Sequence, residues 1–367
     1  MEILIFIAMM LVIVVLQAVT PYVIRRGESF GVMVGEKAAH SPDLRRMKRQ
    51  FLQWNVVVGI TITAVATLCL AVTSNESWQA VIFIISIFAI LIVSFLIYIR
   101  FYKASLAWKR ENLQMSGEKM DIVMVETTFH HQKRTISYAW YLIPLALIFI
   151  TIALTIIYYN QIPSQIPMHY NFANEVTRVA AKSYRTVMMM PVMQVFMLGL
   201  FMFINYMMSR SKQVIDNDNP TDSMKRSILF RLIYSKFNLC MCILLITMFM
   251  VIQLSFIFPI SQTIIAIMTI AVIIVIFGGL VFLMLYVGQG GSRIKLDKNP
   301  QENQSRPVRN DDENWKLGVF YFNRKDPAIF IEKRFGVGWT INMARPIAWL
   351  SIVAIVGIII VISILFS

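Results

Sequence analysis

Eight long stretches without Asp, Glu, Lys or Arg dominate this chain and limit what it can fold into. A helix of about 20 apolar residues crosses the hydrocarbon core of a bilayer. Because that core offers no water, each backbone amide must be satisfied within its own segment, which favours helices. No alternating polar lining points to a β-barrel. We therefore predict an all-α integral membrane protein with about eight transmembrane helices. The predicted spans are residues 3–24, 54–73, 78–99, 138–159, 187–209, 237–258, 261–287 and 346–366.

Basic residues indicate how these spans are oriented. The connections 25–53, 100–137, 210–236 and 288–345 hold 31 of the 34 Lys and Arg residues. Because loops rich in Lys and Arg stay in the cytoplasm, we predict that these four connections are cytoplasmic and that both termini are outside. The net charge of +14 then reflects orientation and contact with the anionic lipids of the inner leaflet. We expect no nucleic-acid partner, because the charge is spread over four loops and forms no single patch.

Composition changes divide the chain into segments. Residues 297–314 hold almost no apolar side chain and are predicted to be a disordered linker. The strand-like runs 317–322, 328–332 and 336–341 then predict a small β-rich cytoplasmic module. Because three short strands cannot form a core alone, this module must pack on the membrane or on other inner loops. The predicted segments are an N-terminal three-span region (1–137), a domain with an outer loop at 160–186 (138–209), a two-span hairpin (210–296), the linker (297–314), and the module with the last span (315–367).

Local signals mark where some helices begin and end. Ser41-Pro42-Asp43 has the residue types of a helix start, and the basic helix that follows is predicted to run into the second span. The glycine-rich stretch 288–291 lacks the Lys-Ser/Thr of a phosphate loop and is predicted to stop a helix. The first span has no basic start of the kind that signal peptides carry, so we expect it to be retained.

The polar residues within the spans indicate packing more than chemistry. Gln17, Gln194, Asn205 and Gln253 have no charge, and such side chains join helices in membranes. An ion-coupled transporter usually carries ionisable groups within its spans, which this chain lacks. No His-Glu-x-x-His pattern and no Ser/His/Asp or Cys/His set is recognisable. We therefore expect that the protein is not an enzyme and that it holds no cofactor and no metal.

The outer loop 160–186 is long for a simple connection, and such loops are usually functional or disordered. Pro163 and Pro167 fix the backbone and push the isoleucines before them into extended geometry, which argues against disorder. His169 can titrate or bind a metal near neutral pH. The alternative is that it forms hydrogen bonds within the loop, with Asn171 and Asn174 supplying turns.

Several motifs resemble a known family. The segment 166–171 reads IPMHYN and is followed by Glu175 and Lys182. This pattern resembles the signature of an uncharacterised bacterial membrane domain that also occurs in the SdpI immunity protein, which protects a producing cell from its own exported killing peptide. Phe30-Gly31-Val32 resembles a segment of related proteins. Residues 315–346 resemble the C-terminal domain of a multi-span family of unknown function that carries the same signature.

The resemblance implies a protein of a bacterial cytoplasmic membrane with a non-enzymatic role in immunity, resistance or envelope signalling. The outer loop would recognise an extracellular peptide or an envelope component, and the inner loops would contact a cytoplasmic protein partner. Together, loop placement and resemblance give these candidate ligand-binding residues: Pro167, His169, Asn171, Glu175 and Lys182.

Two other classes stay open. A transporter or permease subunit for a small or lipophilic solute is favoured by the loop pattern, which repeats after four spans. A metal-dependent membrane enzyme at His169 would need more ligands than the predicted outer face offers.

Overall fold

Long helices make up most of the protein. The computed structural model describes residues 2–25, 27–73, 75–113, 134–170, 176–213, 220–296 and 311–366. Within these ranges, eight helical segments are long and apolar enough to cross a membrane, and each contains most or all of one predicted span. They indicate a multi-pass membrane protein, and the eight predicted apolar segments are confirmed as long helices. The long helices are α1 (Glu2–Val23), α3 (Pro42–Val72), α4 (Glu76–Leu113), α5 (Leu142–Ile157, preceded by the 3₁₀ turn η2, Tyr138–Tyr141), α7 (Met189–Arg210), α8 (Pro220–Leu254), α9 (Gln262–Tyr286) and α10 (Pro346–Phe366).

Short helices and strands lie between the long helices. Two short helices are described, α2 (Glu36–Ala39) and α6 (Tyr184–Val187). The described strands form two-stranded antiparallel sheets. The pairs are β1 (Glu28–Ser29) with β2 (Val32–Met33), β3 (Gln165–Tyr170) with β4 (Val176–Ala181), β5 (Trp315–Lys316) with β6 (Phe320–Tyr321), and β7 (Phe330–Glu332) with β8 (Trp339–Ile341).

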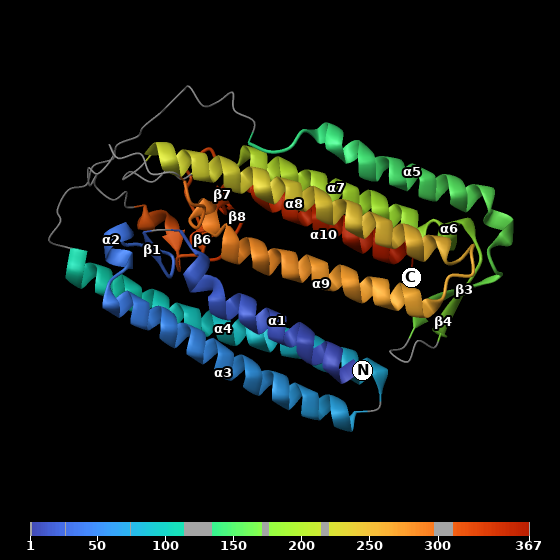
Figure 1. The fold of residues 1–367 in the computed structure, drawn as a ribbon, viewed down its shortest axis with the longest axis horizontal. Coiled ribbons are helices and arrows are strands. Elements are labelled where there is room, and N and C mark those ends of the chain that lie inside the picture. The colour runs from blue at the N-terminus through green and yellow to red at the C-terminus, as the bar shows by residue number, and fades with distance from the viewer. Residues whose placement is uncertain are drawn as a thin grey trace. The chain divides into compact units, whose positions relative to one another are not determined.

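The chain packs as two compact units. Unit 1 consists of Met1–Phe129, Lys212–Phe230 and Val281–Arg345. Unit 2 consists of His130–Ser211, Arg231–Leu280 and Pro346–Ser367. In unit 1 the helices α1, α3 and α4, drawn in blue and teal, lie side by side (Figure 1).

These three helices pack through a small residue and a buried apolar core. Gly59 of α3 lies so close to α1 that a Cβ added there would be 2.5 Å from a methyl group of Val14. Gln17 of α1 accepts a hydrogen bond from Ser94 of α4 (3.5 Å). The close backbone approach at Gly59 is typical of helix pairs in membranes, where small residues allow tight packing.

Helix α3 begins where the sequence predicts. The Ser41 hydroxyl accepts from the backbone amide of Leu44 (3.4 Å), and Pro42 is the first helical residue. The helix then continues without a break to Val72, so the basic segment and the second span are one helix. The predicted stop at 288–291 is also confirmed, since α9 ends at Tyr286 and Gly288 and Gly290 have positive φ.

The predicted β-rich module exists but differs in one detail. Residues 317–322 form no single strand, because Leu317 and Gly318 have positive φ and turn the chain between β5 and β6. At the end of the predicted linker, Asp312–Asn314 form the 3₁₀ turn η5, and residues 297–310 lie outside the described ranges. As expected, the module does not stand alone, and its Phe335 packs on Phe30 and Phe51.

Unit 2 is joined by buried amide side chains, as predicted. Gln194 of α7 donates from Nε2 to Thr151 of α5 (3.3 Å) and to the carbonyl of Ile246 of α8 (2.9 Å). Gln253 of α8 donates to Thr155 of α5 (3.1 Å). Both glutamines are fully buried, so these bonds fix the three helices against one another.

The contact at Gly59 predicts a position-dependent effect of added volume. Gly59→Ala should lower the unfolding temperature in detergent relative to Gly278→Ala, where a Cβ meets nothing within 4 Å. Overpacking of this kind costs about 1–3 kcal/mol. Equal unfolding temperatures for the two variants would contradict the close α1–α3 packing.

Candidate functional site

The predicted outer loop is an ordered β-hairpin. Strands β3 and β4 pair in register from Gln165 with Ala181, and the register shifts on both sides of His169. Such irregularities change the direction in which a strand presents its side chains, and they are frequent next to binding sites. The extended backbone at Ile162, before Pro163, follows the prediction.

The base of this hairpin is held by Lys182. Its ammonium donates to the carbonyl of Ile162 (2.8 Å) and lies 4.7 Å from the centre of the Tyr159 ring. The Tyr159 ring stacks in turn on Tyr184 (4.5 Å between centroids). Ile166 is buried against the chain that follows α8. Lys182 thereby fixes the start of the hairpin with contacts inside the loop.

The structure brings only part of the predicted residue set together. Pro167 is half-buried on β3, and the backbone of His169 follows two residues later. Asn171 and Glu175 lie outside the described residues, as does the side chain of His169.

A buried ionic cluster in unit 1 has no counterpart in the predicted site. Arg334 pairs with both Asp311 and Asp312 and donates to the carbonyl of Gly31 (3.2 Å). Lys109, at the end of α4, pairs with Asp312 (2.6 Å). The cluster therefore ties the C-terminal module to the N-terminal loop and to α4.

Further ion pairs extend this network. Arg25 pairs with Glu332, and Lys212 pairs with Asp326 (2.5 Å). Asp326 also accepts from the hydroxyl of Tyr321 (2.7 Å). Residues from all four basic connections thus meet within unit 1, as expected if these connections share one side of the membrane.

Two tight turns are in contact next to Arg334. Phe30-Gly31 and Leu317-Gly318 both have positive φ. The hydroxyl of Tyr98 donates toward the carbonyls of Phe30 (3.2 Å) and Leu317 (2.8 Å). A Cβ on Gly31 would lie 2.6 Å from the carbonyl oxygen of Gly318, so only glycine fits there.

The cluster changes the acidity of two carboxyl groups. Glu28 is buried, which raises its pKa to about 7, although the charges of Arg25 and Arg334 oppose this shift. Burial also acts to raise the pKa of Asp312, but Arg334 and Lys109 outweigh it and hold the pKa below its ordinary value. Asp312 is therefore a structural anion, whereas Glu28 exchanges a proton near neutral pH.

The sequence did not predict this cluster, because its members lie far apart in the chain. Two sequence features indicate the cluster. One is the acidic end of the linker next to Trp315, and the other is the Lys333-Arg334 pair. Across the described ranges, no group of three or more His, Cys, Asp or Glu side chains could hold a metal ion.

Comparison with known families gives two matches. Residues 146–195 match a "Domain of unknown function (DUF1648)", and residues 324–349 match a "Family of unknown function (DUF5808)". The first match contains strands β3 and β4, and the second contains β7, Arg334 and β8. No curated protein matches the chain. No solved structure matches it. The link to the immunity protein stays a prediction.

Removal of the central guanidinium should destabilise unit 1. Arg334→Met leaves Asp311 and Asp312 without their main partner, at a cost of about 3–5 kcal/mol. Arg324→Met, at an exposed position of the same module, should change stability by less than about 0.5 kcal/mol. Unfolding temperatures in detergent measure both. Equal effects of the two substitutions would contradict a structural role for the cluster.

The raised pKa of Glu28 predicts how stability depends on pH. Below pH 4.5 this residue is protonated in both folded and unfolded chains. As the pH rises to about 7, the unfolded chain releases the proton before the folded chain does. The free energy of unfolding therefore falls by up to about 3 kcal/mol. The charges facing Glu28 are Arg25, Arg334, Asp311 and Asp312.

Glu28→Gln should abolish this loss. Its unfolding temperature should fall less than that of the wild type between pH 5 and pH 8, while the exposed Glu111→Gln should follow the wild-type curve. Parallel curves for wild type and Glu28→Gln would show that Glu28 carries no such shift.

Proposed function

We propose that this protein is a non-enzymatic recognition protein of a bacterial cytoplasmic membrane, acting in immunity, resistance or envelope signalling. Its outer hairpin β3–β4 would bind an extracellular peptide or an envelope component. The observation that carries this proposal is the hairpin itself. Its base is fixed by Lys182, while Val176 and Val179 are about half exposed (48% each).

A two-stranded hairpin is suited to bind an extended peptide. In the described sheet, β3 and β4 pair only with each other, so each strand has an edge with backbone groups available to a further strand. Peptides that add a strand gain affinity from main-chain hydrogen bonds, and side chains such as Val176 and Val179 supply specificity.

The orientation of the hairpin is supported by contacts inside each unit. In unit 1, parts of the four basic connections gather in one ionic cluster. In unit 2, Arg185 donates to the carbonyls of Leu365 and Ile364 (3.2 Å for Ile364), so the last turn of α10 lies next to the hairpin. With basic loops inside, the hairpin and the C-terminus are both outside.

A transporter or permease subunit for a small or lipophilic solute is the second candidate. One observation favours it. The side-chain oxygens of Gln194 and Gln253 are buried in unit 2 and accept no hydrogen bond from the described residues. Such oxygens could accept from a polar solute or from water along a path between the helices. Solute uptake into vesicles separates this candidate from recognition.

Cell survival tests the recognition role. Cells that lack the protein would be compared with cells that express wild type, His169→Ala or Lys182→Met, at matched membrane levels, across a panel of secreted antimicrobial peptides. We expect wild type to raise the tolerated concentration of one peptide, and both variants to lose this protection, because one alters the hairpin and the other releases its base.

Lys103→Met makes the same substitution at an exposed position of α4 and should protect like the wild type. If wild type gives no protection against any peptide while its vesicles take up a solute, the transporter candidate replaces the recognition role.

A further inference from the structure

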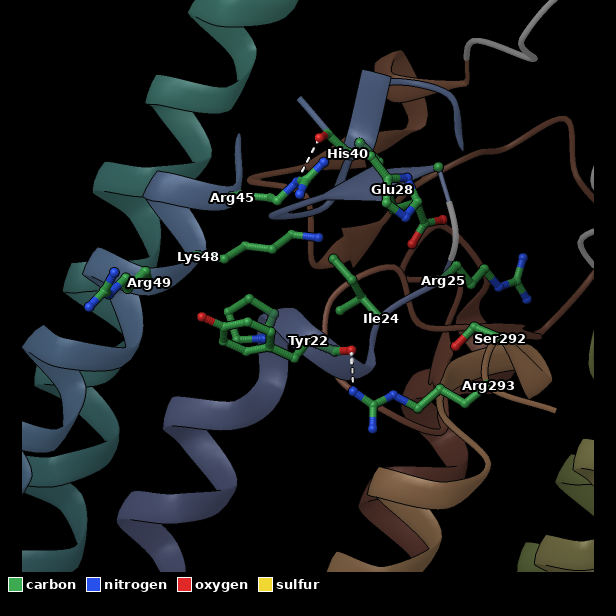
Figure 2. A pocket seen from close by; sticks show the side chains of 13 residues that line it. Tyr22, Ile24, Arg25, Glu28, His40, Arg45, Lys48, Arg49, Ser292 and Arg293 are labelled. Carbon is green, nitrogen blue, oxygen red and sulfur yellow. Dashed lines mark hydrogen bonds between the residues drawn. The ribbon is translucent and has the colours of Figure 1, made fainter. Parts of the chain in front are cut away.

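A pocket of about 460 Å³ opens in unit 1 where α1 ends (Figure 2). Its lining comes from the end of α1, the loop that carries Glu28, the first turns of α3 and the turn after α9. All of these segments belong to unit 1. The volume is within the range of about 300–1,000 Å³ that small-molecule sites occupy.

The pocket concentrates positive charge. Five of its side chains are basic and one is a carboxylate. The basic side chains are Arg25, Arg45, Lys48, Arg49 and Arg293. Like charges this close repel one another, so a site of this kind attracts an anion.

The contacts of these cations show which of them are already engaged. Arg25 pairs with Glu332, and Arg293 donates to the carbonyls of Tyr22 (3.2 Å) and Leu285 (2.5 Å). Arg45 donates from Nε to the carbonyl of His40 (2.7 Å), which leaves the other guanidinium nitrogens available.

Among the described residues, Lys48 and Arg49 have neither the carboxylate partner of Arg25 nor the carbonyl partners of Arg45 and Arg293. Within the described part of the chain, Lys48 and Arg49 form no ion pair. Figure 2 shows the ammonium of Lys48 extending from α3 toward the loop that carries Glu28. Lys48 is half-buried, so its charge is less well hydrated than that of an exposed lysine.

Glu28 is a second, independent sign of a ligand. Its residue surface is only 2% exposed, and its Oε2 atom has no hydrogen-bond partner among the described residues. Glu28 lines the pocket, and Figure 2 shows its carboxyl group between the side chains of Arg25 and Lys48. Because its pKa is raised to about 7, Glu28 can carry a proton at neutral pH and donate it in a hydrogen bond to an anion.

We propose that this pocket binds an organic phosphate, with Lys48, Arg45 and Arg49 contacting the phosphate oxygens. A phosphate group offers several acceptor oxygens to guanidinium and ammonium donors. The volume exceeds what inorganic phosphate alone fills, so the ligand carries a glycerol-sized group or a larger one. Two sources share this chemistry, the head group of an anionic phospholipid and a soluble phosphate ester.

The position of the pocket favours the lipid source. Pro21 and Tyr22 of the lining directly precede Val23, the last residue of α1, which is long and apolar enough to span a membrane. Tyrosines are enriched where a span meets the interface, and basic pockets on the cytoplasmic side bind anionic head groups. Ile24 gives the pocket an apolar side against which a glycerol backbone can pack.

Lipid and ester binding can be measured on the full chain in neutral detergent. Native mass spectrometry would compare how much short-chain phosphatidylglycerol and phosphatidylcholine the protein retains. Binding of glycerol 3-phosphate would be measured as the rise in unfolding temperature that it causes. We expect Lys48→Gln to weaken the retained anionic ligand about tenfold, the effect of one lost charged hydrogen bond. Arg46→Gln removes the same charge from an exposed neighbour on α3 that does not line the pocket, and should bind like the wild type.

Each outcome decides the proposal. Selective loss of phosphatidylglycerol in Lys48→Gln supports a lipid site, and a selective loss of the glycerol 3-phosphate shift supports a soluble ester. Equal binding by Lys48→Gln and Arg46→Gln, for both ligands, overturns the proposal. If Lys48→Gln does not elute like the wild type in size-exclusion chromatography, Arg49→Gln replaces it in the same comparison, because Arg49 is an exposed residue of the pocket lining.

Discussion

The packing of the strand pairs in unit 1 depends on the buried guanidinium of Arg334. It joins Asp311 and Asp312 to the turn at Gly31, and Trp315 covers it with its ring (5.1 Å). A buried charge is tolerated only when its partners and hydrogen bonds are complete. The arrangement therefore requires the C-terminal module, the N-terminal loop and the end of α4 to be in place together, which gives three short strand pairs a stability that none has alone.

Tyr98 and the two glycine turns also join the N-terminal loop to the C-terminal module, through close packing. The hydroxyl of Tyr98 reaches the turns at Phe30 and Leu317, which are 287 residues apart in the chain. Gly31 and Gly318 approach so closely that any side chain would separate them. The ionic cluster and this contact lie in one unit, so a change in either is expected to disturb the other.

The sequence predicted what depends on local pattern. Apolar runs gave the helices, and the Ser41 cap gave the start of α3, because both are encoded by neighbouring residues. It missed the β1–β2 hairpin, since Phe30 adopts positive φ without being a glycine. It also missed the pairing of Lys109 with Asp312, 203 residues away, because an ion pair leaves no periodic trace. For the candidate site, the prolines predicted the extended start of the hairpin, but nothing predicted that Lys182 would bond to its base.

Two kinds of positive charge can be separated within unit 1. The cations of the cluster face carboxylates, as Arg334, Lys109 and Lys212 do, and their charges stabilise the fold. Most cations of the pocket are different, since Arg25 alone pairs with a carboxylate among the described residues, and Arg45, Lys48, Arg49 and Arg293 form no ion pair there. Basic loops orient a membrane protein through the number of Lys and Arg residues that they carry. This effect does not require those side chains to converge on a cavity. Convergence around a cavity beside a buried carboxyl group is what binding needs, so the pocket calls for an explanation beyond topology.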